Sequence, residues 1–129
     1  MIRGLLHVGV YTLNLEESIR FYCDVLGFTL RWQGIVPHSS GRLPVATVVL
    51  QDCVIELVHP ADESRVRKLE GPIQHLALWV DNMDSILREL ADKGITLDED
   101  VSEVQYEGGI RHCFIRGPGN ERIELGELL

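Results

Sequence analysis

The stretch LLHVGVYTLNLEESIRFYCDVLGFTL (residues 5–30) recurs later in the chain as IQHLALWVDNMDSILRELADKGITL (residues 73–97). Each copy has a short apolar segment with a His near its start, then an Asn, then apolar residues at helical spacing, and then a Gly before a second apolar segment. An Asn side chain can cap the first turn of a helix, and Gly readily adopts the left-handed conformation that ends one. Both copies therefore predict a strand, a capped helix and a second strand.

The repeat continues beyond these copies, because the tripeptide Ile-Glu-Leu occurs at residues 55–57 and again at 123–125. The offset from His7 to His75 (75 − 7) and the offset from Glu56 to Glu124 (124 − 56) are both 68 residues. We interpret each half as β-α-β-β-β, an α+β pattern. The strands are expected near residues 5–11, 28–34, 45–50 and 53–59 and again near 73–80, 95–104, 110–116 and 121–127.

The expected organisation is a single domain over residues 1–129. Its parts are a first module at residues 1–60, a linker at 61–72 and a second module at 73–129. The linker is expected to form a short helix and a turn. Residues 34–45 are expected to form an irregular loop, and residues 105–112 a loop or a plain hairpin connection with Gly108 and Gly109 at its bend.

Side chains alternate across a strand, so His7 and His75 should lie on the face opposite the apolar residues that pack against the helices. Glu56 and Glu124 alternate with Ile and Leu in the same way. If the halves pair about a pseudo-two-fold axis, two His and two Glu converge on one cavity. One such residue alone is usually a packed His or a solvent-facing Glu, but four in a repeated register favour a metal site. Their nitrogen and oxygen donors suit zinc, nickel, cobalt, manganese or iron(II).

The composition restricts the class of partner. The chain has 12 basic and 20 acidic residues and a net charge of -8, which argues against nucleic acid or an anionic membrane as a partner. No run is long and apolar enough to span a bilayer, and the N-terminus lacks a signal-peptide layout. The three scattered cysteines, Cys23, Cys53 and Cys113, suggest reduced thiols and a cytoplasmic location.

The four residues His7, Glu56, His75 and Glu124 form a pattern that resembles the vicinal oxygen chelate superfamily. This superfamily contains glyoxalase I, methylmalonyl-CoA epimerase, fosfomycin-resistance enzymes, extradiol dioxygenases and bleomycin-binding proteins. LHVGVYTLNLEESIRFYCDVLGF is similar to the family's opening strand and helix, and GPGNERIELGE to its closing hairpin. The resemblance covers essentially the whole chain. It implies two βαβββ modules that form an open, cup-shaped mixed sheet around a metal site, often in a homodimer.

The His-Glu-His-Glu set is most similar to that of glyoxalase I, the lactoylglutathione lyase family. This similarity implies a metal-dependent isomerase or lyase that moves a proton next to a carbonyl of a small molecule through a metal-bound enediolate. One divalent ion is implied (Ni, Zn, Co, Mn or Fe), with nickel or zinc favoured. Glu124 is the expected principal base, and Glu56 its catalytic partner on the other face.

A redox enzyme using iron(II) and oxygen is disfavoured, because two His and two Glu ligands leave less room for a bidentate substrate together with O₂. Two alternatives of different kinds remain open. One is an epimerase of an acyl-CoA or a keto sugar, of the methylmalonyl-CoA epimerase type. The other is a non-catalytic protein that binds a drug or metabolite and keeps the metal for affinity. Proton exchange with solvent separates them, since an enzyme washes deuterium into its substrate and a sequestering protein does not.

Two aromatic residues, Tyr11 and Trp79, share the expected histidine face and are predicted to line the substrate pocket, although they could simply fill the mouth of the cup. Tyr11 stands where bacterial glyoxalase I usually carries an Arg for the glutathione carboxylate, and Pro60 where an Asn is common. These departures leave dependence on glutathione open.

Several polar residues are weaker candidates. The basic residues of the linker either meet an anionic substrate or form the solvated face of a helix: Arg65, Arg67 and Lys68. The histidines outside the repeat, expected in or near loops, receive no role: His38, His59 and His112.

Overall fold

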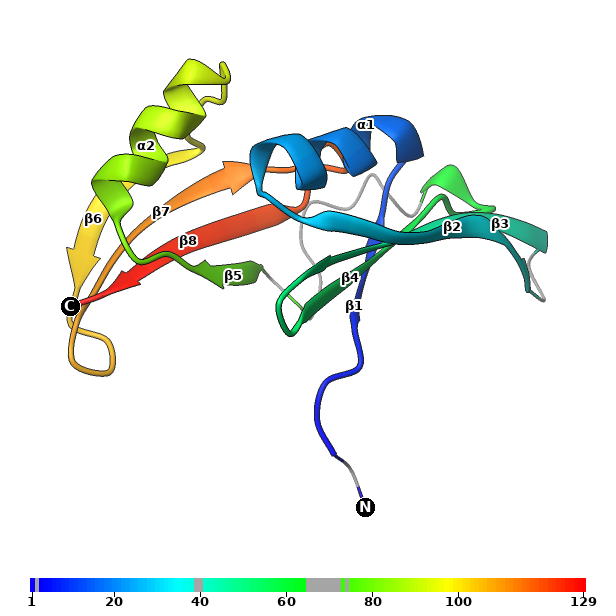
Figure 1. The fold of residues 1–129 in the computed structure, drawn as a ribbon, viewed down its shortest axis with the longest axis horizontal. Coiled ribbons are helices and arrows are strands. Elements are labelled where there is room, and N and C mark those ends of the chain that lie inside the picture. The colour runs from blue at the N-terminus through cyan, green and yellow to red at the C-terminus, as the bar shows by residue number, and fades with distance from the viewer. Residues whose placement is uncertain (2, 39–40, 65–72, 74) are drawn as a thin grey trace. The chain divides into compact units, whose positions relative to one another are not determined.

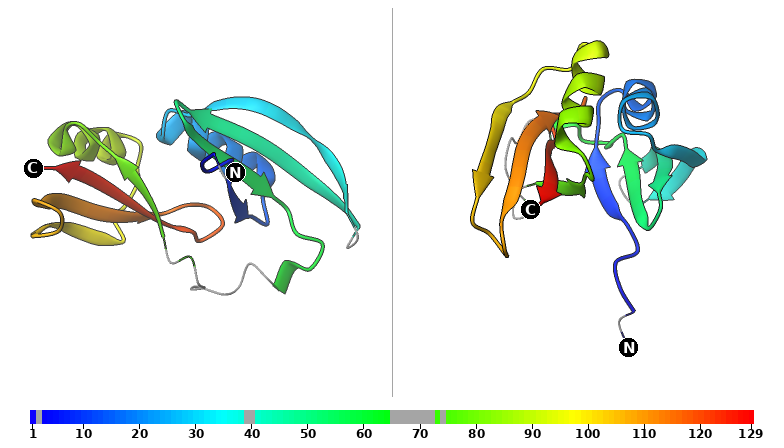
Figure 2. Two further views of the ribbon diagram at one scale, coloured as in Figure 1. Left: turned by 90° about the horizontal axis from the view of Figure 1, so that it is seen from below. Right: turned by 60° about the vertical axis from the view of Figure 1, so that its left-hand side comes forward.

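The computed structural model describes residues 1, 3–38, 41–64, 73 and 75–129. The chain divides into two compact units, Met1–Leu69 with Pro118–Asn120 and Glu70–Gly117 with Glu121–Leu129. Each unit follows the order strand, helix, strand, strand, strand, and the helix lies on one face of its own sheet (Figures 1 and 2). The α+β class and the two βαβββ modules predicted from the repeat are therefore confirmed.

The first unit contains a mixed four-stranded sheet in the order β1-β4-β3-β2. β1 pairs in parallel with β4, and the other neighbours are antiparallel. The elements are β1 (Val8–Tyr11), α1 (Leu15–Arg20), the π-helical turn η1 (Phe21–Val25), β2 (Thr29–His38), β3 (Gly41–Leu50) and β4 (Cys53–Val58).

The second unit repeats this topology, with its strands in the order β5-β8-β7-β6. β5 pairs in parallel with β8, and the remaining pairs are antiparallel. The elements are β5 (Leu76–Trp79), α2 (Met83–Asp92), β6 (Glu99–Val104), β7 (Ile110–Arg116) and β8 (Arg122–Leu128). The parallel pair of each unit brings the first strand of the module against its last strand, and this places the repeated His beside the repeated Glu.

The predicted signals at the helix ends are confirmed. The Asn14 side chain accepts a hydrogen bond from the Glu17 amide at 3.0 Å, and Asn82 accepts one from the Ser85 amide at 2.9 Å. Gly27 and Gly94 have φ values of 80° and 73°, the left-handed conformation expected where a helix ends. The Asn caps mark where α1 and α2 begin, shortly after β1 and β5 end.

The apolar faces of the two last strands form the core, as predicted. Ile55 and Leu57 of β4 are fully buried, and Ile123 and Leu125 of β8 are buried to nearly the same degree. The helical residues Tyr22 and Met83 are also fully buried. Glu56 and Glu124 lie between these apolar residues, so alternation directs their side chains to the opposite face of each sheet.

Several predicted strand boundaries are wrong. β6, expected from residue 95, begins at Glu99. β1 begins at Val8 and β5 at Leu76, because the parallel registers begin at the pairs Val8↔Ile55 and Leu76↔Ile123. The histidines therefore stand directly before these strands. The loop predicted at residues 34–45 is largely the paired ends of β2 and β3, which remain in register as far as His38↔Gly41. Pro37 does not interrupt this pairing, because β2 is an edge strand, where a missing amide is tolerated.

The connection between the modules is described only in part. Residues 61–64 are described, whereas most of the predicted linker helix and turn, with its basic cluster Arg65, Arg67 and Lys68, lies outside the described residues. Among the helices that are described, none has the length and apolar character needed to cross a membrane.

Candidate functional site

The first His–Glu pair arises from the parallel pairing of β1 with β4. Glu56 stands directly opposite Gly9 in this register, and His7 precedes Gly9 by two residues and so shares its face. His7 Nε2 lies 3.5 Å from Glu56 Oε2, and the two side chains are 37% and 34% exposed.

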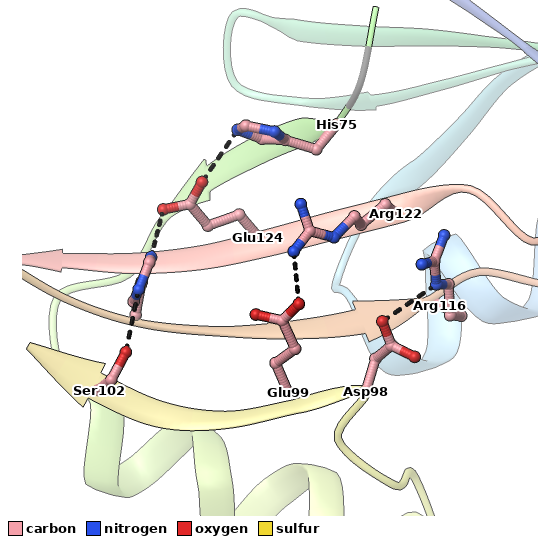
Figure 3. Close-up of polar contacts among 8 residues, drawn as sticks. His75, Asp98, Glu99, Ser102, Arg116, Arg122 and Glu124 are labelled. Carbon is pink, nitrogen blue, oxygen red and sulfur yellow. Dashed lines mark hydrogen bonds and ion pairs between the residues drawn. The ribbon is translucent and has the colours of Figure 1, made fainter. Parts of the chain in front are cut away.

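The second unit reproduces this arrangement. Glu124 stands opposite Ala77 in the pairing of β5 with β8, and His75 precedes Ala77 by two residues. His75 Nε2 lies 3.0 Å from Glu124 Oε2, and Figure 3 shows the two side chains directed toward one another. The His75 side chain is 34% exposed, but that of Glu124 is only 12% exposed. The matching offsets in the sequence thus correspond to matching contacts in the structure.

The donor chemistry of each pair fits a divalent transition metal. In each pair an imidazole nitrogen lies near a carboxylate oxygen, and the residue opposite the Glu in the register is small, Gly9 or Ala77. These are the donors that zinc, nickel and iron(II) accept in proteins. Within the ranges that the structure describes, no group of three or more His, Cys, Asp or Glu side chains is arranged to hold an ion. The sharing of one ion by both pairs stays a prediction.

A second imidazole, that of His112, contacts Glu124, although the sequence pattern gave this residue no role. His112 lies inside β7, so its expected position in or near a loop is wrong. Its Nδ1 is 3.0 Å from Glu124 Oε1, and its Nε2 is 3.1 Å from Ser102 Oγ. The expected strand at residues 110–116 already contained His112. What the sequence lacked was the register that sets this strand beside Glu124.

An aromatic ring packs beside this cluster. Phe114 stands opposite Glu124 in the register of β7 with β8. Its ring lies edge-on to His75, with centroids 5.9 Å apart, and its centroid is 5.3 Å from that of His112. The Arg122 guanidinium lies 3.8 Å from the centre of the same ring and pairs with Glu99 at 2.7 Å. Phe114 therefore restricts both imidazoles that contact Glu124.

The other predicted site residues have fewer neighbours in the structure. Tyr11 and Trp79 each follow their His by four residues and are 42% and 77% exposed, so their rings are available to a ligand. Their assignment to a substrate pocket stays a prediction. The His59 side chain contacts Glu63 at 3.5 Å and the Pro60 carbonyl at 3.1 Å, and its backbone amide donates to the Pro44 carbonyl at 3.0 Å.

The repeated His–Glu pairs lie within a sequence that matches a known family. Residues 6–114 match the model of the Glyoxalase/Bleomycin resistance protein/Dioxygenase superfamily. The chain belongs to this superfamily. The match includes His7, Glu56 and His75 and stops before Glu124, which is a candidate through the repeat and through its contact with His75.

Relatives in the superfamily carry more than one activity. A probable lactoylglutathione lyase from Synechocystis sp. is 30% identical over 94% of this chain and 92% of its own length. The mitochondrial methylmalonyl-CoA epimerase of Mus musculus is 29% identical over 79% of this chain and 60% of its own length. A crystal structure of a glyoxylase/bleomycin resistance protein/dioxygenase domain from Frankia sp. superposes with a TM-score of 0.80 at 20% identity, covering 100% of this chain and 94% of that one. The last likeness shows the shared fold.

Proposed function

We propose that this protein is a metal-dependent isomerase or lyase of the glyoxalase I type, which moves a proton at a carbon next to a carbonyl in a small molecule. The observation that supports this proposal most directly is the repeated pair, His7 with Glu56 and His75 with Glu124, with Nε2–Oε2 distances of 3.5 and 3.0 Å. The similarity to a probable lactoylglutathione lyase over 94% of the chain supports the same reaction class.

The proposed ligands of one divalent ion are His7, Glu56, His75 and Glu124, with nickel or zinc favoured over cobalt, manganese and iron. The ion would supply Lewis-acid polarisation of the substrate's oxygens. Two imidazoles and two carboxylates leave further positions of an octahedron for substrate or water. We expect about one ion per chain, because the two donors of either pair alone do not complete a coordination shell.

The protein's own part in the reaction is proton transfer. Glu124 is the proposed principal base, taking the proton from the carbon and returning it to the neighbouring atom, and Glu56 is the proposed partner on the other face. Their surroundings differ, since Glu124 contacts two imidazoles and Glu56 contacts His7. Tyr11 and Trp79 are proposed to line the pocket through their exposed rings.

The deciding experiment measures the metal content of the purified protein together with turnover of the methylglyoxal–glutathione hemithioacetal. Turnover is measured after metal removal and after re-addition of nickel or zinc. About one ion per chain and turnover restored by metal would establish the proposed reaction. Absence of metal from protein purified and refilled under these conditions would overturn it.

A second candidate function is epimerisation of an acyl-CoA, which the 29% identity to the mitochondrial methylmalonyl-CoA epimerase of Mus musculus favours. Both reactions use the same proton chemistry, so the substrate separates them. Metal binding without hemithioacetal turnover, together with deuterium exchange at the α-carbon of a 2-methyl-branched acyl-CoA or of a keto sugar, would select the epimerase. Metal and ligand binding without exchange in any of these compounds would select a drug- or metabolite-binding protein.

The chain is further proposed to act as a homodimer, as the family resemblance implies. Sedimentation equilibrium of the metal-loaded and metal-free protein tests this, since a monomer of 14.6 kDa and its dimer differ twofold in mass. A monomer in both states would contradict the proposal.

A further inference from the structure

The two sheets differ around the repeated Glu. The residue directly opposite the Glu is Thr47 in the first unit and Phe114 in the second, and the pair two residues further along also differs. In the first unit, Val45 of β3 stands directly opposite Val58 of β4. In the second unit the corresponding pair is His112 of β7 opposite Gly126 of β8. Both pairs occupy the place two residues beyond the Glu on its strand, so one unit carries two valines where the other carries an imidazole and a glycine.

His112 contacts Glu124 diagonally across the antiparallel pair of β7 and β8. Diagonal neighbours in such a pair are within reach of aromatic and long side chains. A Cβ at Gly126 would lie 2.7 Å from Ile110 Cδ1 and 3.9 Å from Glu124 Oε1, so the close neighbour of this position is Ile110. His112 Nδ1 approaches Glu124 Oε1 to 3.0 Å. In the first unit the place of this imidazole is taken by Val45, which offers Glu56 no hydrogen bond.

The hydrogen bonds around His112 specify one tautomer. An ionised carboxylate only accepts, so Nδ1–H donates to Glu124 Oε1. The neutral ring then has its lone pair on Nε2, where it accepts the Ser102 hydroxyl at 3.1 Å. Phe114 packs against the ring at a centroid distance of 5.3 Å, which limits its rotation. The imidazole is thus held at two nitrogens and along one edge.

We propose that His112 is the positioning residue of Glu124: its Nδ1–H holds Oε1 so that Oε2 is directed toward His75 and remains available to the metal. This inference rests on the proposed function, because it assigns Glu124 to the metal. His112 itself is not proposed as a ligand. Outer partners that orient a ligating carboxylate commonly change metal affinity by about 10–100-fold when they are removed.

The test uses four variants. His112→Val places in the second unit the residue that the first unit carries at the corresponding position. His112→Asn keeps an amide donor near the place of Nδ1, whereas His112→Gln places its amide near Nε2. His59→Asn is the control, since the His59 side chain contacts Glu63 and the Pro60 carbonyl rather than a proposed metal ligand. Metal affinity is measured by competition with a chromogenic chelator, and folding by thermal unfolding of the metal-free proteins.

We expect His112→Val and His112→Gln to lose about 10–100-fold in metal affinity, His112→Asn to recover most of that loss, and His59→Asn to match the unchanged protein. If His112 had only a structural role, its replacement would lower the unfolding temperature, and His112→Asn would not recover metal affinity. Equal affinity in His112→Val and the unchanged protein would overturn the proposal.

A second measurement needs no metal. In the metal-free protein, long-range proton–nitrogen correlation of the histidine rings should show His112 as the Nδ1–H tautomer, and the Nε2–H tautomer would overturn the proposal. If the unchanged protein binds no metal but His112 shows the Nδ1–H tautomer, the proposed function fails while the positioning contact is supported. The two failures are therefore distinguishable.

Discussion

Glu56 and Glu124 occupy corresponding places in their sheets but are held differently. Glu124 contacts His75 through one oxygen and His112 through the other, each at 3.0 Å. The contact of Glu56 with His7 is longer, at 3.5 Å, and the Glu56 side chain is 34% exposed against 12% for Glu124. Since a side chain that is already oriented loses less conformational freedom on binding, Glu124 should contribute more to metal affinity than Glu56.

The first prediction compares these two carboxylates. Glu124→Ala should weaken binding of nickel or zinc more than Glu56→Ala, by about tenfold or more, which is about 1.4 kcal/mol. Both substitutions should weaken the same binding site, which holds one ion per chain. The measurement is isothermal titration of the metal-free proteins. Equal losses, or one ion still bound at full affinity by either variant, would contradict the prediction.

The second prediction separates the base from the ligand. Glu124→Gln keeps an oxygen donor but loses the carboxylate charge, so turnover should fall by roughly 10²-fold or more while metal is still bound. Glu56→Gln is the matched variant, which makes the same change at the corresponding carboxylate of the first module. Full turnover by metal-loaded Glu124→Gln would show that another group is the base.

The third prediction concerns the exposed rings. Trp79→Ala should leave the unfolding temperature nearly unchanged, because 77% of Trp79 is exposed and little packing is lost. If the ring lines the pocket, KM should rise severalfold with a smaller change in kcat. Tyr11→Phe, which retains the ring, serves as the comparison. Unchanged kinetics in Trp79→Ala would remove this residue from the substrate pocket.

The fourth prediction tests the helix cap of the second module. Asn82 accepts the Ser85 amide at 2.9 Å, and replacement by Ala should lower the free energy of unfolding by about 1 kcal/mol. Asn82→Ser and Asn82→Asp should recover most of this loss, since both side chains can accept the same amide. Urea unfolding followed by circular dichroism gives the values. If Asn82→Asp lost as much free energy of unfolding as Asn82→Ala, removal of the cap would not be the cause of the destabilisation.

The fifth prediction concerns pH. Burial, with a smaller contribution from Glu124, raises the pKa of the Cys113 thiol above its ordinary value of 9.0, partly offset by Arg111. The folded state thus disfavours the thiolate, and this contribution to stability is fully present below pH about 9 and is lost as the pH rises toward the folded pKa. The urea midpoint should therefore fall less between pH 8 and pH 10.5 in Cys113→Ala than in the unchanged protein. An identical fall would contradict the assignment.

The sequence by itself determined the modules and the faces of their strands. Both can be predicted from short stretches of sequence. Apolar residues alternate around Glu56 and Glu124, and Asn14 and Asn82 stand where helices begin. The repeated offset of 68 residues then marked the His and Glu that share a face. These features need no knowledge of which strand lies beside which.

Only the tertiary structure decided the neighbours of each carboxylate. That His112 reaches Glu124 depends on the antiparallel register of β7 with β8, which sets His112 opposite Gly126 and beside Glu124. The continued pairing of β2 with β3 to His38↔Gly41 likewise overrode the loop expected from Gly, Pro and Ser. The register between two strands is set by the geometry of the turn and by which face is buried. Alternation along one strand therefore shows which face a side chain is on, but not which residue of the neighbouring strand lies beside it.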